Sequence, residues 1–187
     1  MAMAKCEVNN FPCIGVTYDE FDKFCGRELA IQISADLIVN HSSFCTAIPI
    51  SSDFRLEGLK LNDYLTGLKG KTGIYHLWVD HEDCDDHAKN TMICLYVGKG
   101  MAEGRILQHI KEKFPDSDTL YVSFHECENR IAKYLEQLFL DLYCPQFNSA
   151  ERRGTAELFA VWDDNRHDLG TELHEIANAH QKILVNN

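Results

Sequence analysis

The 187-residue sequence has no apolar run close to the roughly 20 residues that a membrane-spanning helix needs. Its first residues, MAMAKCEVNNFPCIG, also lack a basic stretch followed by an apolar one, which a cleavable secretory signal would contain. We therefore expect a cytoplasmic protein without a membrane partner. Export by a machinery that reads a different signal stays open.

Positive charge is scarce as well. The sequence has 18 Lys and Arg residues against 29 Asp and Glu residues, which gives a formal net charge of −11 at pH 7. This balance argues against broad, non-specific affinity for polyanions such as DNA or RNA. It leaves room for a nucleic-acid enzyme whose basic residues gather in one local patch.

Cysteine pairs of the C-x-x-C type are absent too. The eight cysteines are Cys6, Cys13, Cys25, Cys45, Cys84, Cys94, Cys127 and Cys144. Several lie inside apolar runs, as Cys94 does in MICLYV and Cys144 does in DLYCPQF. Disulfides in a secreted chain are the alternative, but we favour free, buried thiols in a reducing compartment.

What the sequence does contain is an ordinary globular composition, 45% hydrophobic and 25% charged residues, and a length that suits one domain or a core with appendages. The middle section, 69–149, follows the order β-β-α-β-α. Its expected elements are strands at 73–79, 91–98 and within 116–126, and helices at 102–114 and 127–143, the last stopped by Pro145. We predict an α+β fold with a small three-stranded antiparallel sheet flanked by helices.

The flanks are expected to be N- and C-terminal helical extensions of that core. A helix start is predicted in 17–39, whose second half could be helix or strand, and 40–55 is expected to be turn-like. A short helix is predicted at 56–68, a strand at 156–164 and a last helix at 168–185. The predicted division is an extension at 1–68 serving substrate recognition, a core at 69–149 and an extension at 150–187.

The core carries an ordered set of motif residues. Gly73-Ile74-Tyr75 lies in the first strand and Tyr96-Val97-Gly98 in the second. Arg105 follows on the next helix, Glu136 on the long helix, and Asn148 in the closing PQFN. This set resembles the GIY-YIG nuclease family over 69–149. The resemblance implies a three-stranded antiparallel sheet, a divalent metal ion and hydrolysis of phosphodiester bonds.

The chemistry suits these residue types. One carboxylate, Glu136, can hold Mg²⁺ or Mn²⁺ if waters fill the other positions, and that ion would polarise the phosphate. Arg105 presents a planar fork to phosphate oxygens and stays protonated at any working pH. The resemblance makes Tyr75 the general base, with Tyr96 orienting water or phosphate and His109 as a partner one turn after Arg105. Asn148 would hold the catalytic geometry by hydrogen bonds, and we expect substrate-side roles for Lys99, Asn148, Gly73 and Gly98.

Each residue alone also has a plain structural interpretation. Tyr75 and Tyr96 could be ordinary strand residues, and Gly73 and Gly98 could mark strand edges. Arg105 could be a solvated helix charge. Glu136 lies beside an apolar stripe, and its structural alternative is a salt bridge to Lys133 or Arg130. It is the combination that favours catalysis.

One departure from the family pattern is the separation of 21 positions between the two tyrosines, about ten more than is common there. The extra residues form an expected acidic loop at 80–90, DHEDCDDHAKN. His81, Cys84 and His87 suggest zinc, but their spacing matches no established pattern and no fourth ligand is visible, so a solvated loop is favoured. A further hypothesis is that this loop shields the site or is recognised by an inhibitor protein.

The sequence thus predicts a metal-dependent endonuclease acting on DNA in preference to RNA, in a restriction-like or toxin-effector role. A toxin of this kind needs an immunity protein, and a homodimer is one way in which a single-site nuclease cuts both strands. Two alternatives stay open: cleavage of RNA by the same site, and a catalytically silent acidic module that binds protein.

Overall fold

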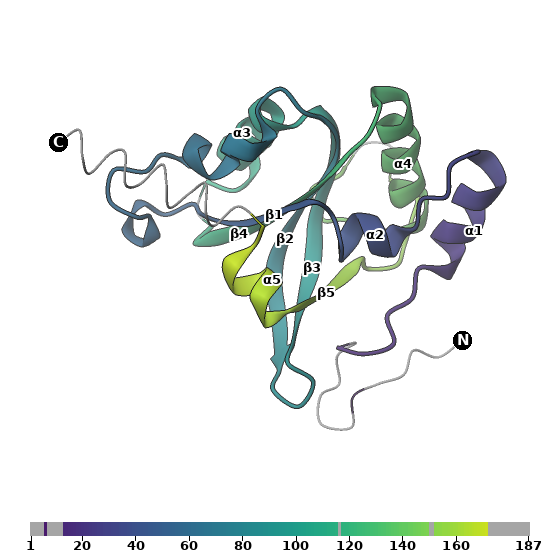
Figure 1. Ribbon diagram of the computed structural model, residues 1–187, viewed down its shortest axis with the longest axis horizontal. Helices are drawn as coiled ribbons and strands as arrows, with labels where there is room; N and C mark the ends of the chain where they lie inside the picture. Colours follow the sequence, from purple (N-terminus) through teal and green to yellow (C-terminus); the bar gives the residue numbers. More distant parts are fainter. Residues whose placement is uncertain (1–5, 7–12, 116, 150–151, 172–187) are drawn as a thin grey trace.

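The computed structural model describes residues 6, 13–115, 117–149 and 152–171 (Figure 1). Within these ranges the chain forms an α+β fold around one open antiparallel sheet. The strands are β1 (Phe44–Pro49), β2 (Thr72–Cys84), β3 (Lys89–Met101), β4 (Thr119–Glu126) and β5 (Phe159–Asp163). Their order in the sheet is β1-β4-β2-β3-β5, and every neighbouring pair is antiparallel.

The predicted three-stranded sheet is the centre of this larger one, and the expectation of three strands was too small. β5 confirms the strand expected in 156–164. β1 was not expected, because 40–55 was assigned to turns on the strength of its Asn, Ser and Pro residues. An edge strand tolerates proline, and Pro49 is the last residue of β1. Both flanks therefore contribute strands to the sheet of the predicted core.

The helices pack on both faces of the sheet (Figure 1). They are α1 (Asp19–Glu28), α2 (Ala35–Val39), α3 (Ala102–Lys113), α4 (Asn129–Leu142) and α5 (Asp164–Leu169), with 3₁₀ turns η1 (Ser52–Phe54) and η2 (Leu61–Leu68). The segment 17–39 divides into α1 and α2, and the helix expected at 56–68 is the 3₁₀ helix η2. Most of the helix predicted at 168–185 lies outside the described residues. Among the described helices, none is long and apolar enough to cross a membrane.

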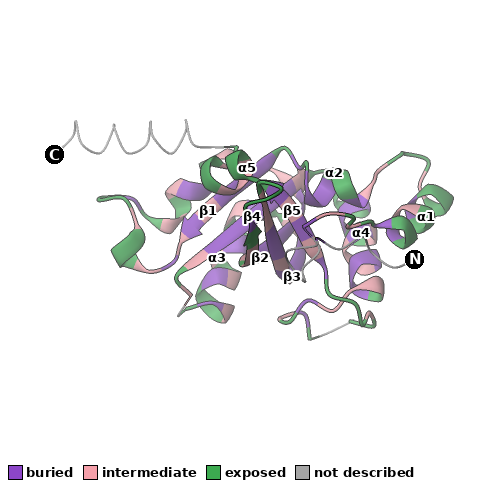
Figure 2. Cartoon of the chain, turned by 90° about the horizontal axis from the view of Figure 1, so that it is seen from below, coloured by how far each residue is buried: buried purple, intermediate pink, exposed green. Residues whose placement is uncertain are grey.

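The buried side chains form two main clusters, one on each face of the sheet, and they appear as the purple interior in Figure 2. Ile74 and Trp78 of β2 face α1, α2 and α4, where Phe21 and Phe139 pack at a ring separation of 4.2 Å. The alternate residue Tyr75 faces η2 and α3. This alternation follows from the pleat of a strand that is covered on both faces.

β2 and β3 form a long hairpin that extends beyond the rest of the sheet (Figure 1). The expected loop at 80–90 is wrong for most of its length, because pairing continues to Cys84 opposite Lys89 and only 85–88 form the turn. Two register shifts insert an extra residue, His81 on β2 and Leu95 on β3. Bulges of this kind change the direction in which the following side chains point.

Candidate functional site

Tyr75 and Gly98 stand opposite each other in the β2–β3 ladder. A Cβ atom added at Gly98 would lie 2.5 Å from the Tyr75 ring, so the ring occupies the space that any other side chain at 98 would need. The glycine of the second motif is thus required by close packing of the tyrosine of the first. Tyr75 itself is fully buried.

Tyr96 joins Tyr75 on the same face because of the Leu95 bulge. Cys94 packs with the cluster beneath α4, whereas Tyr96, two residues later, packs with the cluster beneath α3. In a regular strand, residues two positions apart lie on the same face, so without the bulge Tyr96 would lie on the face of Cys94. The rings of Tyr75 and Tyr96 are 6.3 Å apart.

α3 brings His109 against this pair. The Tyr96 hydroxyl lies 3.1 Å from His109 Nε2, and the Tyr75 and His109 rings are 6.3 Å apart. Burial, together with the positive charges of Lys113 and Arg105, lowers the pKa of His109. A neutral imidazole can accept the Tyr96 proton at Nε2, and its Nδ1 is buried with no hydrogen-bond partner among the described residues.

Arg105 lies one turn before His109, and its side chain passes over Gly100, which has a positive φ of 107°. Burial raises the pKa of Tyr75, and the nearby Arg105 guanidinium opposes that rise. The Tyr75 hydroxyl nevertheless makes no well-formed hydrogen bond within the described chain. A buried hydroxyl in this position is costly unless something else completes its hydrogen bonding.

Glu136 on α4 pairs with Lys99 of β3, at 2.5 Å between Oε2 and Nζ. From the sequence, the alternative to catalysis was a salt bridge from Glu136 to Lys133 or Arg130. The structure instead pairs Glu136 with Lys99, on the strand that carries the second motif. The Glu136 carboxylate is close enough to Tyr75 and Tyr96 for its charge to raise the pKa of both, after the larger effect of burial. The expected site residues Tyr75, Tyr96, Lys99, Arg105, His109 and Glu136 thus lie together at one end of the hairpin.

Asn148 and Gly73 have structural positions. The Asn148 side chain accepts from the backbone N–H of Val97 and donates to its carbonyl, both at 2.8 Å, and the residue is buried. It thereby extends the sheet along β3 between Tyr96 and Gly98. A Cβ at Gly73 would lie 2.1 Å from the carbonyl oxygen of His125, so close strand packing accounts for this glycine. The Asn148 side chain is thus engaged by the backbone, and Gly73 has no side chain with which to contact a substrate.

Comparison with models of protein families, with curated proteins and with solved structures gives no match for this chain.

Lys113 is a site residue that the sequence reasoning missed. Its Nζ lies 4.8 Å above the Tyr96 ring and donates to the Phe147 carbonyl at 2.9 Å. The signal was available, since Lys113 is four residues after His109 and eight after Arg105 on one helix face. Lys113, Arg105 and Lys99 thus bring three positive charges to this end of the protein, next to the carboxylates of Glu112 and Glu136.

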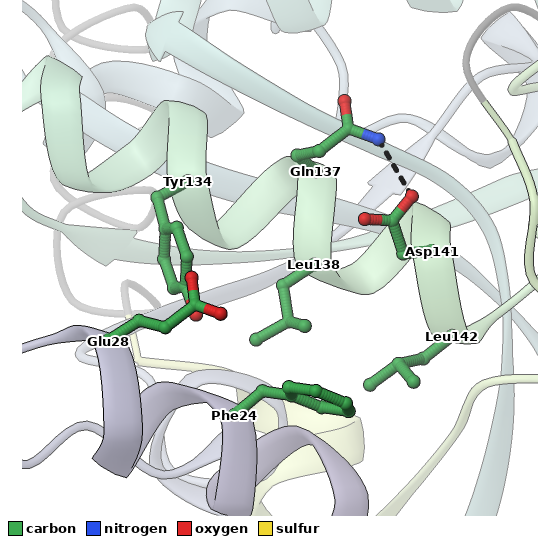
Figure 3. A pocket seen from close by; sticks show the side chains of 7 residues that line it. All are labelled: Phe24, Glu28, Tyr134, Gln137, Leu138, Asp141 and Leu142. Atoms are coloured by element: carbon green, nitrogen blue, oxygen red, sulfur yellow. Dashed lines mark hydrogen bonds between the residues drawn. The ribbon is translucent and has the colours of Figure 1, made fainter.

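A pocket between α1 and α4 is lined by Phe24, Glu28, Tyr134, Gln137, Leu138, Asp141 and Leu142 (Figure 3). It contains none of the predicted site residues. Among the described residues, Glu136 belongs to no group of three or more acidic, His or Cys ligands that could hold a metal ion. An ion there would be completed by water and phosphate oxygens, which is how Mg²⁺ is usually held.

Two predictions about the hairpin tip, on metal binding and on shielding of the site, need correction. Cys84 and His87 do belong to a group of potential metal ligands, but its other members are Cys6 and Cys13 from the N-terminal segment, and His81 is not among them. The tip is also nine residues from Tyr75 along β2, roughly 30 Å at the rise of a strand. It therefore does not shield the tyrosines.

Proposed function

We propose that this chain is a metal-dependent endonuclease that hydrolyses phosphodiester bonds. The residues that would carry out the reaction are Tyr75, Tyr96, Arg105, His109, Lys99 and Glu136. The proposal starts from the resemblance to the GIY-YIG family. The observation that carries it is the buried Tyr75 hydroxyl, which has no well-formed hydrogen bond among the described residues although it lies beside Arg105. A water molecule or a phosphate oxygen would complete its hydrogen bonding.

Arg105 is the residue that must move for catalysis. Its guanidinium is exposed and lies beside the Tyr75 hydroxyl. A phosphodiester entering between α3 and the end of the hairpin would draw the guanidinium onto its oxygens through charge-assisted hydrogen bonds. That shift uncovers Tyr75 while keeping a positive charge next to it, which favours its phenolate.

Tyr75 then takes the proton of the attacking water, and Tyr96 holds the water or the phosphate through its contact with neutral His109. Lys99 and Lys113 add positive charge beside the developing negative charge of the phosphate. Hydrolysis proceeds without a covalent intermediate, because water is the nucleophile.

Glu136 is the residue that would hold Mg²⁺ or Mn²⁺. The Lys99 ammonium pairs with this carboxylate. When bound, the divalent ion would polarise the phosphate and stabilise the leaving oxygen. Lys99, which pairs with that carboxylate, would contact the phosphate.

We infer DNA as the substrate and a restriction-like or toxin-effector role. The net charge of −11 makes non-specific binding along nucleic acid weak, so cleavage depends on the positive charges of Lys99, Arg105 and Lys113 around the site. A toxin role implies an immunity protein, and cutting of both strands implies two copies of the site in a homodimer.

The test is nicking of supercoiled plasmid by the wild type and by Glu136→Ala, each with Mg²⁺, with Mn²⁺ and with EDTA. We expect nicking that needs metal and is lost in Glu136→Ala. Asp141→Ala is the matched control, because Asp141 is an exposed carboxylate on the same helix that contacts Gln137. Labelled RNA in parallel separates ribonuclease activity. No cleavage of either nucleic acid by folded wild type would favour the protein-binding module.

A further inference from the structure

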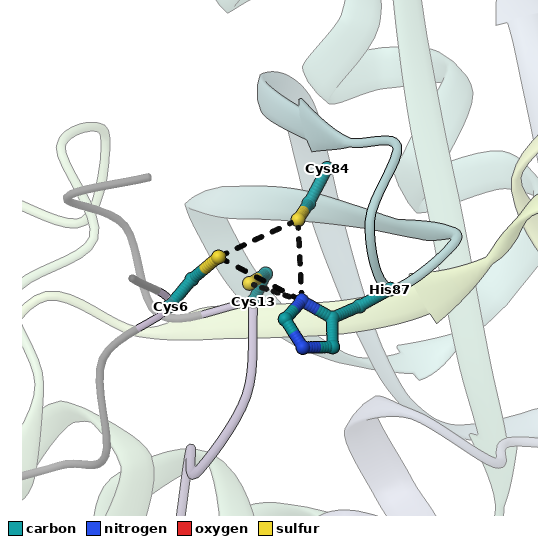
Figure 4. Close-up of side chains that lie close together, drawn as sticks. All are labelled: Cys6, Cys13, Cys84 and His87. Carbon is teal, nitrogen blue, oxygen red and sulfur yellow. Dashed lines mark hydrogen bonds between the residues drawn. The ribbon is translucent and has the colours of Figure 1, made fainter. Parts of the chain in front are cut away.

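Four side chains converge at the tip of the β2–β3 hairpin (Figure 4). They are Cys6 and Cys13 from the N-terminal segment, Cys84 at the end of β2 and His87 in the turn, and their ligand atoms all lie within 4.8 Å of one another. The three cysteines are buried and His87 is exposed. A turn in which the His87 N–H donates to the Cys84 carbonyl brings the last two side chains together.

The separations match the edges of a metal tetrahedron. His87 Nδ1 is 3.7, 3.7 and 3.4 Å from the sulfurs of Cys6, Cys13 and Cys84, and the Cys6 and Cys84 sulfurs are 3.8 Å apart. Zinc bonds of about 2.3 Å to sulfur and 2.0 Å to nitrogen give tetrahedral edges of about 3.8 Å and 3.6 Å. We propose that Cys6, Cys13, Cys84 and His87 bind one Zn²⁺ ion.

Other uses of these thiols fit less well. A disulfide needs about 2.05 Å between two sulfurs and would leave the third cysteine and the histidine unused. Hard cations such as Mg²⁺ prefer oxygen ligands, whereas soft thiolates with imidazole select zinc. Four protein ligands also leave no open position, which marks a structural rather than a catalytic ion.

The site would attach the N-terminal segment to the hairpin. Among the described residues, the third apolar cluster consists of Cys6, Cys13 and Cys84 with only Ile14 packed against it. So small a cluster buries too little apolar surface to order both segments by itself. Coordination would supply the missing stabilisation, roughly 30 Å along the strand from Tyr75. The ion therefore holds the chain in place and takes no part in the chemistry proposed at Tyr75.

The first experiment is elemental analysis of the full chain, purified with a thiol reductant and without chelator. We expect one zinc per chain. Cys84→Ser and His87→Asn should each weaken zinc binding by more than the 10- to 100-fold typical of changes outside the ligand set. His81→Asn, on the same hairpin, and Cys127→Ser, a partly buried thiol outside the group, are matched controls and should keep zinc.

Because a ligand variant could simply misfold, a second measurement uses the wild type alone. Removing zinc and titrating with Co²⁺ should give the intense visible bands of tetrahedral, thiolate-bound cobalt, and adding Zn²⁺ should abolish them. Folded wild type that binds neither ion, or zinc retained by both ligand variants, would overturn the proposal. Iron in place of zinc would overturn the assignment of the site to zinc. Glu136→Ala should keep its zinc, so failure here and failure of the proposed nuclease are distinguishable.

Discussion

Tyr75 lies against Gly98 so closely that a single added carbon at position 98 would sit 2.5 Å from its ring and its hydroxyl oxygen. The two residues are cross-strand partners, 23 positions apart in sequence. The contact explains why a tyrosine on one strand needs a glycine on the next. It also fixes the buried Tyr75 hydroxyl beside Arg105.

Gly98→Ala should displace the Tyr75 ring. We expect a loss of about 1–3 kcal/mol in the free energy of unfolding from overpacking, and a drop of about 100-fold in plasmid nicking from misplacement of the hydroxyl. Thermal unfolding and the nicking assay measure the two effects. Gly26→Ala is the control, since nothing lies within 4 Å of its added carbon and alanine favours helix. Full activity in Gly98→Ala would show that Tyr75 is not positioned by this contact.

Asn148→Ala should destabilise the protein without removing any substrate contact. The variant leaves the buried N–H and carbonyl of Val97 without their partners, at a cost of about 1–3 kcal/mol for each unsatisfied group. Urea unfolding measures the change. Asn90→Ala removes an exposed hydrogen bond to Asp164 and should change stability by about 0.5 kcal/mol or less. Equal stabilities for the two variants would contradict the role assigned to Asn148.

Nicking by the wild type in Mg²⁺ should increase with pH into the alkaline range. Burial raises the pKa of Tyr75 above its ordinary value of about 10, so the fraction of phenolate grows throughout the accessible range. Tyr75→Phe should lose activity and the alkaline rise together. Tyr134→Phe should retain both, because Tyr134 packs against the cluster on the opposite face of the sheet from Tyr75 and lines the pocket between α1 and α4. A flat profile would argue for another base.

Acid should destabilise the fold through His76. This side chain is fully buried between Trp78 and Phe139, and burial lowers its pKa from 6.5 to about 3. Between those values the unfolded chain binds a proton that the folded chain does not, so stability falls as the pH falls, by about 1.4 kcal/mol per unit. Above pH 6.5 the contribution is complete.

The measurement is the free energy of unfolding from pH 7 to pH 4. His76→Leu should flatten its pH dependence, whereas His41→Leu should not, because His41 is exposed. A slope unchanged by His76→Leu would assign the acid sensitivity to other groups. His125 contributes in the same direction, since burial also lowers its pKa.

Local patterns predicted the elements between 73 and 143 well. β-branched and aromatic residues indicated β2 and β3, and the apolar stripe of 127–143 indicated α4. They failed for β1, whose polar and proline neighbours resemble a turn until β4 supplies its partner strand. They also failed at the hairpin tip, where charged residues remain paired because β3 continues opposite them. Strand pairing is a property of two distant segments, and one segment alone does not encode it.

By itself, the sequence determined the motif residues and the chemistry that each can perform: phenols, a guanidinium, an imidazole and one carboxylate in a fixed order. Only the tertiary structure decided their contacts. The Leu95 bulge turned Tyr96 toward Tyr75, and the crossing of α4 over β3 paired Lys99 with Glu136. The clearest case is the group of four potential zinc ligands. Its N-terminal pair, Cys6 and Cys13, lies about 70 residues before its hairpin pair, Cys84 and His87. Ligand geometry depends on distances in space, and those follow from packing of the whole sheet rather than from spacing along the chain.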